Sequence, residues 1–297
     1  MGAKGFIQVG ANKKSGPVEI GDFIWIVDRS QNCSQIDGDG RCTRVTCRPM
    51  KETTTLLWTC LVSGTLSCAT CKEPTEVAYH LWSASFDMDR TEYHIHYDVS
   101  ALKKSLEIVK ADSPHGRIGI QIHDSFLADL SNAKNPLIED PADVVMLGVE
   151  GKELHMSKKV LVHHSLIFKL LYSTSFAKEK MNFYAVNNVK LKEFIHFLSV
   201  LHGFRVSIDK DSVKYLLKLG AQFQSKVVQG KCEDFLLTAD TDDVPLITKF
   251  RLANTYNLKV LLLDTAEKIP VEELKPIPRA ELCQIAEDIV YKKFSLV

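Results

Sequence analysis

The chain has 297 residues, and its 37 Lys and Arg residues are balanced by 37 Asp and Glu residues. A formal charge of zero creates no global field that would draw the chain to nucleic acid or to an anionic membrane. No apolar run approaches the roughly 20 residues that span a bilayer, and the start lacks the long apolar core of a secretion signal. We therefore expect an intracellular protein, cytoplasmic or nuclear, that binds neither nucleic acid nor membrane.

The first 124 residues show the pattern of short strands separated by Gly, Asp, Pro or Lys-rich turns. No stretch of useful length has helical spacing, and Trp25, Trp58 and Trp82 each lie within an apolar strand, where they are expected to fill a core. The pattern predicts an antiparallel β-sandwich over residues 1–124. Its expected strands are residues 23–27, 42–48, 56–62, 76–85, 92–99, 106–110 and 118–123.

The cysteines and histidines of this region leave some metal-site alternatives open. Because nothing indicates export, we expect free thiols rather than disulfides. Cys68 and Cys71 have half of a zinc-finger spacing, and a site would need further ligands from other strands. A calcium loop at residues 37–40 would need Glu at its twelfth position, where Arg48 stands, so a hairpin turn is expected. We predict no metal and no cofactor; the residues that a metal would have to recruit are Cys42, Cys47, Cys60, His94 and His96.

Residues 143–172 carry the most informative pattern of the chain. An apolar run, residues 144–149, reaches a turn at residues 150–152, and Leu154 and Met156 then alternate with polar neighbours as in a second strand. From Val160 onward the apolar residues recur at helical spacing, and Ser165 is placed to cap the last helical stretch. The pattern predicts a hairpin followed by a helix that is interrupted near Ser165.

This order of elements resembles the start of the BTB domain, also called the POZ domain, a protein-interaction fold without catalytic machinery. In that resemblance, residues 126–130 correspond to the family's first helix, residues 186–189 to the next strand and residues 191–201 to an amphipathic helix ended by Gly203. The implied fold class is α+β, with a BTB domain over residues 125–237.

The sandwich, placed directly before a BTB domain, resembles a MATH domain. Residues 21–26, Gly-Asp-Phe-Ile-Trp-Ile, are similar to that family's opening strand with its Trp. The resemblance implies that the sandwich binds an extended segment of a substrate protein along one sheet.

After Gly203 the chain is predicted to be helical. Two stretches share the same pattern of a helix, a tight turn and a second helix. In the first, residues 212–223 lead into 227–236; in the second, residues 245–256 lead into 258–269. Two repeats are too few for a solenoid, which needs about three to bury a continuous core. The first pair resembles the end of the BTB fold, and the second resembles the helical (BACK-like) extension that often follows it, assigned here to residues 238–297 with a last helix at 280–294.

The BTB resemblance implies a homodimer interface. It would include Leu127 and Leu130 of the first helix, and a buried charge at Asp143 matched by a basic partner at Lys158. A buried carboxylate needs a nearby cation or hydrogen bonds, because an uncompensated charge in a low dielectric costs several kcal/mol. The alternative interpretation is that Asp143 and Lys158 only cap local structure at the surface.

The resemblance also implies a surface that grips the cullin-three scaffold of a RING ubiquitin ligase. Its candidate residues are Phe168, Leu170 and Leu171, followed by a short motif at Phe176-Ala177-Lys178, in which Lys stands where the family has Glu and Glu179 comes one position late. No recognisable catalytic motif is present, so we do not expect an enzyme. We predict a homodimeric adaptor that recruits substrates to a cullin ligase; the alternative is a dimerising scaffold without ubiquitin transfer.

Overall fold

The structure is a computed structural model that describes residues 2–10, 13–29, 40–68, 78–98, 115–172 and 183–295. The chain divides into two compact units. The first comprises Met1–Asp129 with Arg205–Ser207, and the second comprises Leu130–Phe204 with Ile208–Val297.

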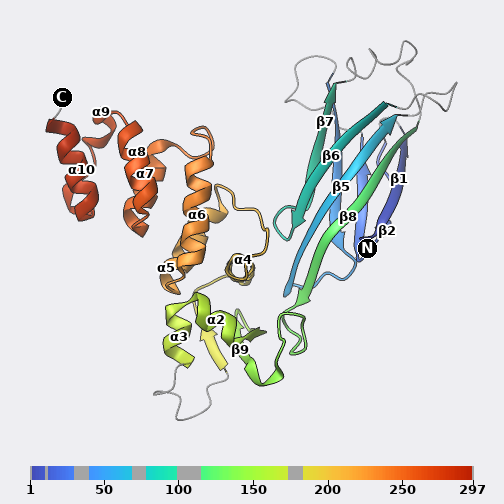
Figure 1. Ribbon diagram of the computed structural model, residues 1–297, viewed down its shortest axis with the longest axis horizontal. Coiled ribbons are helices and arrows are strands. Elements are labelled where there is room, and N and C mark those ends of the chain that lie inside the picture. The colour runs from blue at the N-terminus through green and yellow to red at the C-terminus, as the bar shows by residue number, and fades with distance from the viewer. Residues whose placement is uncertain are drawn as a thin grey trace. The chain divides into compact units, whose positions relative to one another are not determined.

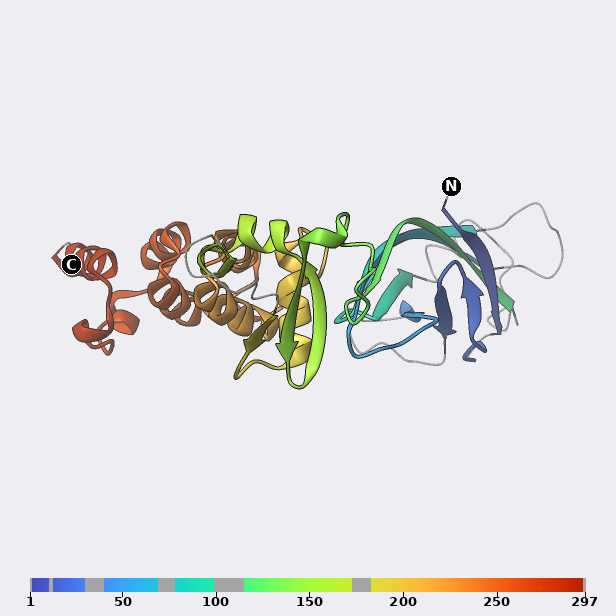
Figure 2. The same cartoon turned by 90° about the horizontal axis from the view of Figure 1, so that it is seen from below.

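The described residues of the first unit form two four-stranded sheets (Figure 1, Figure 2). One has the order β1-β8-β5-β6, and the other has the order β2-β3-β4-β7. All pairings within both sheets are antiparallel, as predicted for the sandwich. The strands are β1 (Lys4–Gly10), β2 (Val18–Ile20), β3 (Phe23–Asp28), β4 (Gly40–Pro49), β5 (Leu56–Cys68), β6 (Ala78–Asp87), β7 (Glu92–Asp98) and β8 (His115–Asp129).

The core of this unit lies between the two sheets, because alternate residues of each strand point to the same face. Phe23, Trp25 and Phe86 are fully buried there, and the Trp25 ring meets the Phe86 ring edge-on at 5.4 Å between centroids. Cys47 and Cys60 are buried free thiols in the same core, and burial raises the pKa of Cys47. The predicted core role of the three tryptophans is confirmed by their burial.

Two sequence predictions about the strands need correction. The short strands β1 and β2 were not predicted, because each is only three to seven residues long and weakly alternating. Residues 126–130 were predicted as a helix, but residues through Asp129 continue β8 and pair with Leu56 onward in β5. A five-residue segment gains too few intrahelical hydrogen bonds to offset helix nucleation, whereas β5 offers a complete ladder. The strand predicted at 106–110 lies outside the described residues.

In its described residues, the second unit starts with a three-stranded sheet of order β10-β9-β11. The predicted hairpin is confirmed: β9 (Val144–Val149) pairs antiparallel with β10 (Lys152–Ser157) around Glu150 and Gly151, both at positive φ (Figure 2). β11 (Phe183–Val186) pairs parallel with β9. It lies three residues earlier than predicted, because the chain turns at Asn188, which has a φ of 59°.

Helices make up the rest of the second unit. Most predicted positions are confirmed to within a few residues, including α4, which coincides with residues 191–201. The short helix α9 was not predicted, and α10 begins at Gln284 rather than residue 280 because a 3-10 turn follows Pro278. The helices are α2 (Lys158–His164), α3 (Leu166–Tyr172), α4 (Leu191–Leu201), α5 (Ser212–Gln222), α6 (Lys226–Thr238), α7 (Leu246–Tyr256), α8 (Lys259–Lys268), α9 (Val271–Leu274) and α10 (Gln284–Ser295), with 3-10 turns η1 (Pro141–Asp143) and η2 (Arg279–Glu281).

Candidate functional site

The joint between α2 and α3 is held by Ser165, at the position where the sequence predicts an interruption. The Ser165 hydroxyl accepts a hydrogen bond from the Phe168 backbone N–H at 3.2 Å, which caps α3, and donates one to the Phe223 carbonyl at 2.6 Å. The Phe168 ring is fully buried and stacks on the Phe223 ring at 5.0 Å. These contacts fix the start of α3 against the end of α5.

A surface groove of about 980 Å³ opens beside this joint. We call it the basic groove, because its lining contains three lysines and two histidines but no carboxylate among the described residues. Leu166 and Val227 add exposed apolar surface. The lining residues are Lys159, Val162, His163, His164, Ser165, Leu166, Lys169, Ala221, Gln224, Lys226, Val227 and Gln229.

The residues predicted for the cullin surface fall into three classes. Leu170 is 58% exposed and lies on α3 near the basic groove, while Leu171 is half-buried. Phe168 is fully buried, so the expectation that it contributes to an exposed surface is wrong, because its ring supports α3 from beneath. The motif residues Phe176 and Lys178, and Glu179 after them, lie outside the described residues.

The predicted pairing of Asp143 with Lys158 is not present within one chain. The Asp143 carboxylate accepts hydrogen bonds from the Ser157 hydroxyl at 2.6 Å and from the Lys159 backbone N–H at 3.1 and 3.2 Å. The Lys158 ammonium instead lies 5.9 Å from the centre of the Tyr172 ring. Asp143 therefore joins the start of β9 to the start of α2, in the manner of a cap.

Leu127 and Leu130, predicted on the first helix, have different positions in the structure. Leu127 lies in β8 and packs against the sandwich core, and Leu130 is fully buried. Because both side chains have intramolecular contacts, the expected helical face that would present them does not form.

The first unit carries a second groove, of about 470 Å³, between the edge strands β6 and β7. We call it the edge groove. Trp82 and Tyr93 stack at 6.1 Å between ring centroids, and Leu81 is 75% exposed. Its lining consists of His80, Leu81, Trp82, Ser83, Tyr93, His94, Ile95 and His96. Polar and apolar residues alternate over residues 92–97 of the sequence, but the place of this strand at the edge of a sheet is decided by strand order.

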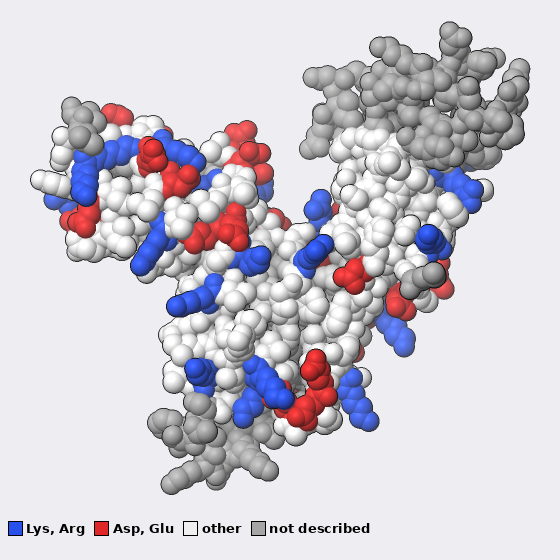
Figure 3. Space-filling model, in the orientation of Figure 1, with Lys and Arg blue, Asp and Glu red and all other residues white. Residues whose placement is uncertain are grey.

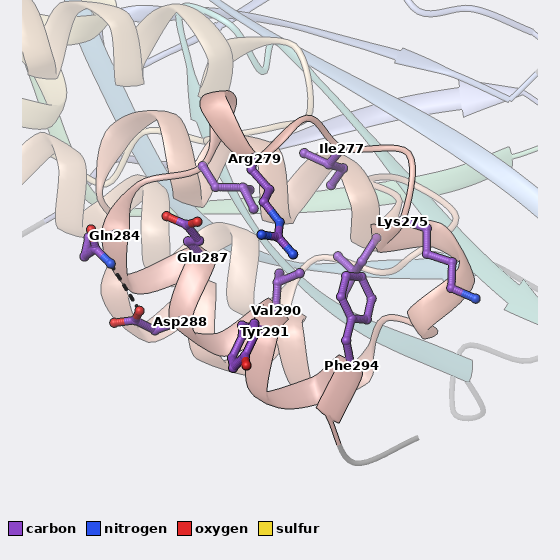
Figure 4. Close-up of a pocket in the computed structure, with 11 residues that line it drawn as sticks. Lys275, Ile277, Arg279, Gln284, Glu287, Asp288, Val290, Tyr291 and Phe294 are labelled. Carbon is purple, nitrogen blue, oxygen red and sulfur yellow. Dashed lines mark hydrogen bonds between the residues drawn. The ribbon is translucent and has the colours of Figure 1, made fainter.

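The third hollow, of about 370 Å³, lies among the C-terminal helices (Figure 4). It brings together Lys275 and Arg279 with Glu287 and Asp288, and Gln284 donates a hydrogen bond to Asp288 at 3.1 Å. Lys, Arg, Asp and Glu residues are mixed over these helices in Figure 3. The balanced charges give this hollow no clear preference for a charged ligand.

Among the residues that the structure describes, no group of three His, Cys, Asp or Glu side chains is placed to hold a metal ion. The Cys42 sulfur lies 3.2 Å from Nδ1 of His94, but the described residues place no third zinc ligand beside this pair. Residues 37–39 of the calcium-loop alternative lie outside the described residues. Helices long and apolar enough to cross a membrane are likewise absent from the described segments.

Comparisons with known proteins agree with this architecture. Residues 136–240 match the BTB/POZ domain family. The chain is 24% identical over 266 residues to BTB and MATH domain-containing protein 36 of Caenorhabditis elegans, a match that covers 85% of this chain and 82% of that protein.

Two further relatives match over shorter segments. BTB and MATH domain-containing protein 38 of Caenorhabditis elegans is 30% identical over 39% of this chain and 29% of its own length. Human Kelch-like protein 24 is 26% identical over 39% of this chain and 19% of its own length. Residues 136–240 therefore form a BTB/POZ domain, and the β-sandwich that precedes it is consistent with a MATH domain.

Proposed function

We propose that this protein is a non-catalytic adaptor that homodimerises through its BTB domain and recruits a substrate protein to a cullin-three RING ubiquitin ligase. In this proposal, the sandwich binds the substrate, the BTB domain binds the cullin, and the helices after Thr238 form a BACK-like extension. The observation that carries it is the presence, in one chain, of a BTB domain with an exposed groove and a sandwich in which a second groove lies between the edge strands β6 and β7.

The basic groove and the adjacent α3 surface support cullin binding. Leu166, Leu170 and Val227 expose apolar side chains there, and exposed apolar surface with a polar rim is typical of a protein-binding site. The cationic rim favours a partner that carries acidic residues around an apolar contact.

The edge groove supports substrate binding. Among the described residues, β6 lies at one end of its sheet beside β5, and β7 lies at one end of the other sheet beside β4. An exposed strand edge is a template for an added strand, and several recognition domains bind extended peptides in this way. We infer that a segment of the substrate lies extended along β7.

A pair of matched substitutions separates the two surfaces. Leu170→Asp is expected to abolish capture of the cullin-three N-terminal region by the purified full-length chain and to leave peptide binding unchanged. Leu81→Asp, the same change at an exposed leucine of the sandwich, is expected to abolish peptide binding and to leave cullin capture unchanged. Phe176→Ala tests the motif directly and should also abolish cullin capture. Undiminished cullin recovery with Leu170→Asp and Phe176→Ala would count against the adaptor.

The scaffold alternative is favoured by one observation, the basic residue at position 178. A reversed charge at an interface removes an attraction and adds a repulsion. If the wild-type chain dimerises and binds partner proteins but captures no cullin, the scaffold replaces the adaptor. Dimerisation is measured independently by sedimentation of the purified chain.

A further inference from the structure

We infer that the outer face of the β1-β8-β5-β6 sheet binds an acidic segment of a partner protein, whose Asp or Glu carboxylate pairs with Arg117 next to an apolar contact on Phe6. Neither residue lines the edge groove, so the inference goes beyond the proposed function and does not depend on it. The sandwich would then contact partner proteins through two separate surfaces.

The strand register places Phe6 and Arg117 together on the outer face of this sheet. Phe6 on β1 stands opposite Gly119 on β8, and Arg117 is two residues before Gly119 on the same strand. Because alternate residues of a strand share a face, all three lie on the outer side, whereas Ile7 and Ile118 are buried between the two sheets. In Figure 1, β6, β5, β8 and β1 form the layer that faces the viewer.

The Arg117 guanidinium lies over the Phe6 ring, with its Cζ 3.7 Å from the ring centroid. Gly119 permits this arrangement, because a Cβ at that position would lie 3.3 Å from the Phe6 ring and 2.7 Å from the Thr65 hydroxyl oxygen. A cation over an aromatic face is attracted by the ring quadrupole, so the contact orients a side chain that would otherwise have many rotamers. The N–H groups of a guanidinium lie in its plane, so those at its outer edge remain available to a ligand.

Arg117 has no ion-pair partner among the described residues. Arg44, on the other sheet, is by contrast paired with Asp28 at 3.0 Å and Glu92 at 3.4 Å. Figure 3, in the orientation of Figure 1, shows a largely uncharged surface over the middle of the sheet. Acidic residues are absent from the three strand segments around Arg117, which are residues 4–8, 63–67 and 117–121. The positive charge of Arg117 is therefore not neutralised by the described part of this face.

A carboxylate complements this site better than other protein groups do. Its two oxygens match the edge of a guanidinium, which allows two parallel charge-assisted hydrogen bonds. Phe6 is 57% exposed although it carries the guanidinium, so an apolar residue adjacent to the acid has a contact. A phosphate, with its higher charge, would gain from a second cation. Lys4 stands opposite Gln121, which is four residues from Arg117 along β8 (121 − 117), or about 13 Å at the rise of a strand.

The test compares matched peptides on the purified full-length chain. The probes are fluorescent, end-blocked heptapeptides with a central Glu or a central Gln between leucines, and binding is followed by fluorescence anisotropy at low salt. We expect the Glu peptide to bind about fivefold more tightly, which is the magnitude of one well-oriented but exposed ion pair. Arg117→Gln should bring this ratio close to one. Arg48→Gln, which removes the same charge from an exposed arginine of β4, should leave it unchanged.

Phe6 is a positioning residue for Arg117, and its variants test that role. Phe6→Leu keeps an apolar side chain but removes the ring, so the Glu-to-Gln ratio should fall while the Gln peptide binds as before. Phe6→Tyr, which restores a ring face, should recover the ratio. Both side chains are exposed, so thermal unfolding of the variants should remain close to that of the wild-type chain.

Equal binding of the two peptides, no binding of either, or a preference for Glu that survives Arg117→Gln would each overturn the inference. Tighter binding of a phosphoserine peptide than of the Glu peptide would make phosphate the ligand instead. If Arg117→Gln dissociates an oligomer of the wild-type chain in sedimentation experiments, the face is an interface between copies and its assignment to an acidic segment is wrong.

Discussion

The Phe168 ring stacks on the Phe223 ring at 5.0 Å between centroids, with an interplanar angle of 14°, and so fastens α3 to the end of α5. The two residues are 55 positions apart in the sequence (223 − 168). The buried contact between Phe168 and Phe223 therefore positions the exposed side chains of α3, including Leu166 and Leu170.

Replacing Phe168 with Ala should therefore destabilise the BTB domain strongly. Loss of a fully buried aromatic ring costs about 3–5 kcal/mol, because both apolar burial and packing are lost. Leu170→Ala, two residues away and 58% exposed, should change the free energy of unfolding by less than about 0.5 kcal/mol. Urea titrations of both variants provide the comparison, and similar midpoints for the two would contradict the assigned burial.

Substitutions of Asp143 test whether its carboxylate acts as a local cap or as one partner of an ion pair with Lys158. Asp143→Asn retains the acceptor oxygen but loses charge, and Asp143→Ala should cost about 1–2 kcal/mol because Ser157 and the Lys159 N–H lose their acceptor. Lys158→Ala serves as the control and should have a smaller effect on stability. If the Lys158 and Asp143 variants lose the same free energy of unfolding, the two side chains would instead act as a coupled pair.

The same Asp143 variant tests the proposed dimer. In the proposed homodimer, which the BTB resemblance implies, Asp143 would lie at the interface, so we expect Asp143→Ala to weaken self-association in sedimentation experiments. A variant that is less stable but sediments as an unchanged dimer would restrict Asp143 to its capping role.

His202 should make the BTB domain sensitive to acid. Burial, with a smaller contribution from His164, lowers the pKa of His202 to about 4 from its ordinary 6.5. The unfolded chain then binds the additional proton between pH 6.5 and about 4, so stability is complete above 6.5 and falls as the pH drops through this window. Each unit by which the pH falls within this window lowers the free energy of unfolding by up to about 1.4 kcal/mol.

The measurement is the urea midpoint of the wild-type chain and of His202→Phe at a series of pH values. The substitution should flatten the dependence below pH 6.5, although His164, whose pKa is also lowered by burial and by His163, will leave a residual slope. An identical slope in the variant would assign the acid sensitivity to other groups.

Lys293 should anchor the last helix. Its ammonium donates hydrogen bonds to the carbonyls of Ala266, Glu267 and Ile269 at the end of α8, where a cation is favoured by the helix dipole. Lys293→Met should expose α10 to proteolysis, whereas Lys292→Met, at an exposed neighbouring position, should not. Equal protease resistance of both variants would mean that α10 is held by its apolar face alone.

Local patterns were sufficient to predict much of this protein. Helix α4 begins and ends where the amphipathic spacing predicts, and the β9–β10 hairpin follows from an apolar alternation around Glu150 and Gly151. Such elements are determined by residues close in the sequence, whose propensities and turn chemistry agree with one another. For the same reason Ser165 could be recognised as a cap before its partners were known.

Other features were decided only by the tertiary structure. Residues 126–129 became a strand because β5 offered them a ladder, and Phe168 became a core residue because Phe223 lies across it. The edge groove and the Cys42–His94 contact arise from strand order, which joins residues 52 positions apart. Pairings of this kind depend on which distant segments bury each other, and a one-dimensional pattern holds too little information about that choice.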